Sequence, residues 1–216
     1  MISETAEQVR LGTLRRWTPH SLQTFVDELS GILADVPVTL HPLGFVHFEL
    51  TQMLDVQKDE RVRVHLWNPL LSPPDSAGGV HDHTWHLRSG VLYGRLLNKN
   101  FRPIKDPTGP LTGSIVSYGK TNTFTAAGHY RLDFLKEIVV SAGESYSIPS
   151  RIVHESALLS PQALTLVVSQ PDDQALELGP LLLTAKGAPA SGTEQREVIS
   201  PARAEQVLFE FIQSAV

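Results

Sequence analysis

The sequence predicts a mainly β protein, a sandwich or barrel of short strands with helices near both ends. Three observations predict this class. Residues 61–67 alternate strictly between aliphatic and polar or aromatic side chains, as in a strand with two different faces. Turn-forming stretches interrupt the middle of the chain about every ten residues, which is the spacing of sandwiches and barrels. Amphipathic helical patterns occur near the two termini.

The N-terminal helical pattern begins at a recognisable cap. Thr18 followed by Pro19 places a capping hydroxyl before a proline at the first helical position, and Pro37 ends the element. A further short helix is expected within residues 2–16, and Ser200-Pro201 caps a helix at the C-terminal end. The apolar stripes of the two capped helices are Leu22, Phe25, Val26, Leu29 and Leu33, and Val207, Leu208, Phe211 and Ile212.

Short β-rich segments fill the region between these helices. The expected strands are residues 44–50, 61–67, 90–97, 114–118, 136–141, 145–148, 152–158, 163–169 and 181–184. Residues 186–193 are expected to form a loop. The sequence therefore predicts a helical extension over residues 1–36, a β-barrel over 37–185, and a loop and helix over 186–216 packed on the same domain.

The composition excludes several classes of site and partner. The chain has 216 residues, nine His and no Cys, so disulfides, cysteine-ligated zinc and iron–sulfur clusters are impossible. The 18 basic and 23 acidic residues give a net charge of −5, without a basic run, so no nucleic-acid partner is expected. No apolar run approaches the ~20 residues of a membrane span. The acidic start lacks a signal-peptide pattern, and a cytoplasmic location is expected.

The most informative segment is a pair of histidines on one predicted strand. Side chains at positions i and i+2 of a strand point to the same face, so His81 and His83 present two imidazoles side by side. Two neutral nitrogen donors form half of a divalent-metal site. The candidate for the third ligand is His154, which follows a glycine turn, a strand and a proline turn.

These segments resemble the two motifs of the cupin superfamily. The resemblance covers roughly residues 60–170. It consists of His81-x-His83 followed by Gly94, and then Gly143-x5-Pro149-x4-His154. Cupins are double-stranded β-helix jelly rolls that hold one metal ion in a small barrel. The resemblance thus implies that His81, His83 and His154 share one divalent metal.

Within the superfamily, the stretch from His81 to Thr84 and the preceding Leu66-Trp67 are most similar to the thiol dioxygenases. This branch, which includes cysteine dioxygenase, binds non-haem iron(II) through three histidines. The resemblance therefore favours Fe(II), although Ni, Mn, Co or Zn could occupy the same nitrogens.

The chain departs from the family pattern at several positions. Leu87 stands where the first motif usually has its glutamate ligand, so the resemblance implies no carboxylate ligand there. Arg151 stands where the second motif usually has glycine. The strand ending in Ser169-Gln170-Pro171 lacks the His and Tyr of the Ser-His-Tyr triad of thiol dioxygenases. Cysteine as the substrate is therefore not implied.

Three residues near the motif are candidate catalytic groups. Alternation from His83 places His86 on the opposite strand face together with Arg88, but a bulge near Thr84-Trp85 would turn His86 inward. Arg88 in a barrel mouth could bind a substrate carboxylate, and Tyr93 could donate a hydrogen bond in the cavity. The alternatives are surface or structural roles for all three.

The remaining polar residues give weaker signals. Arg63, His65 and Trp67 share one face of a predicted strand, and that face could line the cavity or face solvent. No partner pattern surrounds His20, His41, His47 or His129, and these are expected to be structural or surface residues.

The predicted function is that of a mononuclear metal-dependent cupin. The leading interpretation is a non-haem iron(II) dioxygenase that acts on a small chelating substrate, anionic or thiol, together with O₂. The alternatives are a metal-dependent isomerase or lyase, and a non-catalytic small-molecule-binding cupin, because one fold hosts many functions. The family resemblance is compatible with a homodimer.

Overall fold

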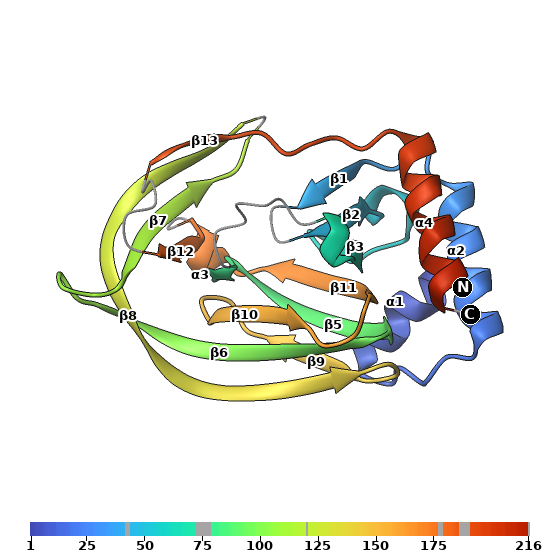
Figure 1. Cartoon of the computed structure of the whole chain (residues 1–216), viewed down its shortest axis with the longest axis horizontal. Helices are drawn as coiled ribbons and strands as arrows, with labels where there is room; N and C mark the ends of the chain where they lie inside the picture. Colours follow the sequence, from blue (N-terminus) through green and yellow to red (C-terminus); the bar gives the residue numbers. More distant parts are fainter. Residues whose placement is uncertain (42–43, 72–78, 120, 177–178, 186–190, 216) are drawn as a thin grey trace.

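The structure is a computed structural model that describes residues 1–41, 44–71, 79–119, 121–176, 179–185 and 191–215. Two antiparallel sheets face each other, and helices cover the outer side of one of them (Figure 1). The helix-covered sheet has the strand order β1-β2-β3-β11-β5-β9. Its strands are β1 (Val38–His41), β2 (Phe45–Glu49), β3 (Arg61–Trp67), β5 (Trp85–Tyr93), β9 (Ser145–Ile148) and β11 (Ala163–Pro171).

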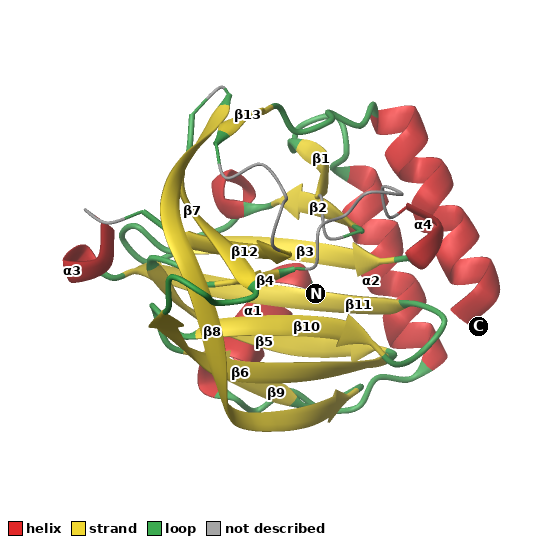
Figure 2. Cartoon of the chain, turned by 60° about the vertical axis from the view of Figure 1, so that its left-hand side comes forward, coloured by secondary structure: helices red, strands yellow, loops and turns green. Residues whose placement is uncertain are grey.

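The second sheet is strongly curved and has the order β13-β8-β6-β10-β4-β12-β7. Its long strand β8 pairs with β7 through its first half and with β6 through its second half, so the sheet turns back on itself (Figure 2). Its strands are β4 (Val80–His81), β6 (Arg95–Lys105), β7 (Leu111–Ser117), β8 (Asn122–Ser141), β10 (Val153–Leu158), β12 (Leu181–Ala185) and β13 (Gly192–Glu194). The prediction of a mainly β jelly roll with helices at both ends is confirmed.

Three helices pack on the sheet that contains β3: α1 (Ile2–Leu11), α2 (Pro19–Gly31) and α4 (Pro201–Ala215). As predicted, the Thr18 hydroxyl caps α2 by accepting a hydrogen bond from the Ser21 backbone N–H at 3.1 Å. Helix α3 (Asp173–Leu176) and the single 3₁₀ turns η1 (Thr51–Met53) and η2 (Pro69–Leu71) are short connections.

The largest hydrophobic core lies between these helices and the sheet. Its members include Phe25 of α2, Val64 of β3, Leu166 of β11 and Phe211 of α4, each less than 2% exposed. Most of the apolar burial that stabilises the fold is therefore outside the space between the two sheets. That space is left available for polar side chains.

The observed strand boundaries agree with the predictions at several elements and differ at others. The strands predicted at 61–67 and 145–148 have those bounds. The prediction of one continuous strand over residues 90–97 is wrong, because Gly94 (φ 82°) turns the chain between β5 and β6. A side chain at Gly94 would lie 2.3 Å from the Gln162 carbonyl oxygen, so the turn requires glycine. The loop predicted at 186–193 falls largely outside the described residues.

Within the described residues, no helix is long and apolar enough to cross a membrane.

Candidate metal centre

Two adjacent strands of the curved sheet, and the segment that follows one of them, bring three histidines together. The prediction that His81 and His83 share one strand is wrong, because β4 ends at His81 and His83 lies beyond it. His81 of β4 and His154 of β10 are direct partners in the antiparallel ladder, so their side chains stand on the same face. His83 follows two residues after His81. One ring nitrogen from each of the three lies within 4.8 Å of the others. The structure therefore brings together the three residues that the sequence predicts to be ligands of one metal.

Backbone carbonyls orient two of the three imidazoles. Nδ1 of His81 lies 2.7 Å from the Gly79 oxygen, and Nδ1 of His154 lies 3.3 Å from the Ile152 oxygen. Because a carbonyl can only accept, each Nδ1 carries the proton and each Nε2 presents a lone pair. Such outer hydrogen bonds fix the tautomer of metal-ligating histidines.

The group has the chemistry that a divalent cation requires. Burial lowers the pKa of His154 to about 3, and burial together with the neighbouring histidines lowers the pKa of His83 well below 6.5. The three imidazoles are therefore neutral at pH 7 and act as nitrogen donors. The Nε2 atoms of His81 and His83 are 3.0 Å apart. Two nitrogens bound at about 2.1 Å to one metal, at right angles, would be separated by about the same distance.

An ion pair next to the cluster holds Asp82, the residue between His81 and His83. Asp82 is 2% exposed, and its carboxylate accepts a hydrogen bond from the Leu181 N–H at 2.6 Å. The same carboxylate lies 3.2 Å from Nη1 of Arg151. The Arg151 backbone N–H in turn donates to the His83 oxygen at 2.8 Å. Arg151, found where the family motif has glycine, adopts a left-handed backbone (φ 62°), so the position keeps the conformation that glycine favours.

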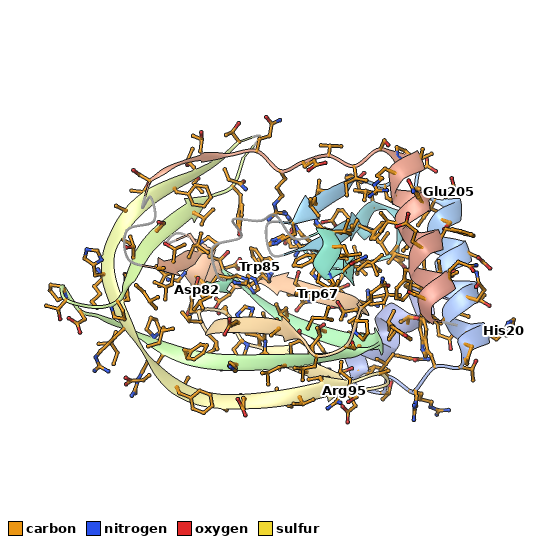
Figure 3. The ribbon with its side chains drawn as sticks, viewed as in Figure 1. His20, Trp67, Asp82, Trp85, Arg95 and Glu205 are labelled. Atoms are coloured by element: carbon orange, nitrogen blue, oxygen red, sulfur yellow. The ribbon has the colours of Figure 1, made fainter. Side chains whose placement is uncertain are left out.

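A large cavity of about 1610 Å³ opens from the histidine group into the space between the sheets. Arg63, His65 and Trp67 of β3 line it, whereas Val62, Val64 and Leu66 pack against the helices. The sequence left two alternatives for the polar face of this strand, and the structure selects the cavity. In Figure 3, Trp67, Trp85 and Asp82 gather between the sheets, while His20, Arg95 and Glu205 lie at the periphery.

The structure does not bring His86 or Arg88 to the cavity. Trp85, Leu87 and Ser89 line it, and regular alternation along β5 turns His86 and Arg88 outward, since no bulge occurs near Thr84. The His86 side chain is 59% exposed, and its Nδ1 accepts from the Ser150 N–H at 3.1 Å. The Arg88 guanidinium instead binds the Arg10 carbonyl at the end of α1.

Tyr93 also lies outside the cavity, for a different reason. The register of β5 and β11 shifts between Leu164 and Thr165, so that Leu92 is an extra residue in the ladder. This bulge turns Tyr93 toward the helices, where its ring meets Phe211 edge-on at 5.4 Å. The three candidate catalytic residues therefore have structural surroundings away from the histidine group.

Sequence reasoning missed part of the cavity wall. His41 and His47, expected to be structural or surface residues, line the cavity together with Glu49 and Arg196. The available signal was the strict alternation of residues 61–67. An entirely aliphatic face must pack on the amphipathic helices, so the opposite face of this sheet must face the interior.

No family model and no curated protein matches the chain. Among solved structures, it is similar to an RmlC-like cupin from Shewanella frigidimarina, with 12% identity over 66% of this chain and 90% of that chain and a TM-score of 0.36. It is also similar to a structure of the DMSP lyases RdDddP and RnDddQII, with 19% identity over 63% of this chain and 51% of that chain and a TM-score of 0.35. A third similar structure is hydroxypropylphosphonic acid epoxidase from S. wedmorenis, with 15% identity over 62% of this chain and 55% of that chain and a TM-score of 0.37.

The chain spans about half the length of the lyase and epoxidase chains that it matches. The jelly-roll assignment itself rests on the strand order and on the two facing sheets of this chain. Fold and site together define a two-sheet jelly roll whose three-histidine group could hold a divalent metal.

Proposed function

We propose that this protein is a mononuclear metal-dependent enzyme, with one divalent ion held by His81, His83 and His154. The observation that carries the proposal is the convergence of three neutral imidazoles, one buried and two partly buried, within 4.8 Å at the wall of a large cavity. Among the described residues no carboxylate joins this group, so the ion's charge of +2 is not compensated by its ligands. Such a centre favours anionic substrate groups.

Fe(II) is the metal that we propose, and oxygenation of a small chelating acid or thiol is the reaction. The support is the resemblance of the His81–Thr84 segment to the thiol dioxygenases. When bound, iron supplies open coordination positions and the electrons for O₂ chemistry. The chain itself supplies the orientation of the donors through Gly79 and Ile152, and apolar groups such as Leu87 and Ile148 that limit water in the cavity.

The proposal is tested by loading the protein anaerobically with Fe(II), Zn(II) or no metal and offering small thiols and carboxylic acids. We expect O₂ consumption coupled to substrate loss in the Fe(II) form alone. Turnover that depends on metal but uses no O₂ would instead indicate an isomerase or lyase. Ligand binding without turnover in any form would indicate a binding protein. An Arg88→Gln variant is a suitable matched control, because its side chain lies outside the cavity.

A further inference from the structure

The geometry points to a second anion-binding subsite on the wall of the cavity, formed by Arg63 and Arg196 on the side of the sheet that contains β3. A substrate that fits both subsites carries two acidic groups, one at the histidine group and one at these arginines. The inference deepens the proposed function, and it rests on that function for the first acidic group only.

Arg63 is a buried cation with unused hydrogen-bond donors. Its side chain is 12% exposed and lines the cavity. Its Nε donates to Glu49 at 3.2 Å, and within the described part of the chain its Nη atoms make no hydrogen bond. A guanidinium in this state can receive a carboxylate or phosphate through two parallel N–H donors.

The indole of Trp85 connects Arg63 to the histidine group. The Arg63 guanidinium carbon lies 5.5 Å from the centre of the Trp85 ring. On the metal side, the Trp85 ring stacks on His83 at 4.7 Å, with 13° between the planes. Arg63 and His83 therefore contact the same ring, and a small organic molecule lying along the indole can reach both.

Arg196 adds a second cation to this wall. It lines the cavity, and its guanidinium lies 6.0 Å from the centre of the Tyr118 ring. In the ranges that the structure describes, no carboxylate forms an ion pair with it. Burial, and in addition the positive charge of Arg196, lower the pKa of His41, His47 and His65, and all three histidines line the same cavity as Arg196.

The least exposed acidic side chains on this wall are already paired. Glu49 is the carboxylate that pairs with Arg63, whereas Glu60 pairs with Arg10 at 2.6 Å. The other acidic side chains on this side of the lining, Asp59 and Glu197, are exposed to solvent. Burial keeps His47 neutral by lowering its pKa to about 3, and its buried Nε2, which lies 3.9 Å from Glu49 Oε2, lacks a hydrogen-bond partner among the described residues. The described part of this wall thus offers an anion the Nη donors of Arg63 and the unpaired cation Arg196.

Calorimetric titration with matched pairs of ligands tests the inference. The ligands are succinate, glutarate and adipate, each compared with its half-amide, which has the same length and one charge less. We expect at least one diacid to bind metal-loaded protein about ten-fold more tightly than its half-amide, because the second carboxylate gains a charge-assisted pair. Arg63→Gln should reduce this preference to about three-fold or less, and Arg196→Gln should reduce it partly. Arg88→Gln should leave it unchanged.

Two further measurements separate the possible failures. Elemental analysis of every variant reports the metal site independently, and titration of metal-free protein reports the arginine subsite alone. If the unmodified protein holds no metal but still prefers diacids in a manner that depends on Arg63, the proposed function is refuted and the second subsite stands. If Arg63→Gln does not fold because Glu49 loses its partner, the double variant Glu49→Gln/Arg63→Gln removes both charges. Equal binding of diacids and half-amides, no binding of any diacid, or an unchanged preference in the Arg63 and Arg196 variants would overturn the inference.

Discussion

At the scale of single residues, the site depends on groups that select the orientation and protonation of three imidazoles. His81 and His154 present Nε2 because Nδ1–H of each donates a hydrogen bond to a backbone oxygen. His83 is placed by the neighbouring Asp82, whose carboxylate is held by Leu181 and Arg151. Donor orientation thus comes from ordinary hydrogen bonds next to the cluster.

Single replacement of His81, His83 or His154 by Ala should reduce bound metal at least about ten-fold, because two nitrogens cannot replace a three-donor site. Elemental analysis after dialysis against metal measures the loss. The matched control is His20→Ala on the exposed surface of α2, which should bind as much metal as the unmodified protein. Full metal content in all three cluster variants would contradict the assignment of the ligands.

Replacement of Asp82 by Ala should weaken metal binding by about 10–100-fold, although Asp82 is not a ligand in the proposed site, because the segment that carries His83 loses its anchor. The change should also lower the free energy of unfolding by about 2 kcal/mol, since the Leu181 N–H loses a charged acceptor. Metal titration and urea denaturation measure the two effects. Asp133→Ala removes an exposed ion pair with Arg102 and should change neither quantity appreciably. Unchanged metal affinity in Asp82→Ala would show that the ion pair has no positioning role.

At the scale of secondary-structure elements, the strands separate two environments. The aliphatic face of β3 joins the helix-packed core, and its polar face lines the cavity. The same division applies to β5, where alternation leaves His86 and Arg88 outside and a bulge at Leu92 redirects Tyr93. One extra residue in a ladder changes the face of every residue after it.

Two phenylalanines of helix α4, one buried against the sheet and one exposed, test the separation of packed and open faces. Phe211 is 1% exposed and Phe209 is 62% exposed. Phe211→Ala should lower the free energy of unfolding by about 3–5 kcal/mol, through lost burial and the cavity that remains. Phe209→Ala should change it by no more than about 0.5 kcal/mol. Denaturant melts of the two variants give the comparison, and similar losses would mean that α4 does not pack on the sheet as described.

At the scale of the whole molecule, the fold places its largest hydrophobic core outside the two-sheet interior and a cavity with both polar and apolar walls inside it. Helices α1, α2 and α4 supply the apolar layer for one sheet. The cavity can therefore contain partly buried imidazoles and arginines while the helix-packed core supplies most of the stabilising apolar burial.

Buried neutral histidines should make the fold sensitive to acid. Burial lowers the folded-state pKa of His47 to about 3, against about 6.5 for a histidine in the unfolded chain, so the unfolded chain takes up this proton first as the pH falls. The stabilising contribution is complete above pH 6.5 and is lost progressively toward pH 3. Urea melts at intervals across this range should show a smaller decline for His47→Gln than for the unmodified protein. His20→Gln should follow the unmodified protein, and a parallel decline in all three proteins would rule out this role for His47.

The sequence by itself determined the class of fold, the capped helices and the three histidines, because these signals are local or depend on fixed spacing. The Thr18-Pro19 cap, the alternation of residues 61–67 and the spacing of Gly143, Pro149 and His154 need no knowledge of distant contacts. The tertiary structure decided which strand faces meet the cavity. Whether Arg63 faces solvent or the interior depends on where the helices pack, and whether Tyr93 points inward depends on a register shift against β11. Contacts between distant segments set both outcomes. The alternation of residues 61–67 shows that this strand has two different faces, whereas no local pattern contains the register shift that turns Tyr93.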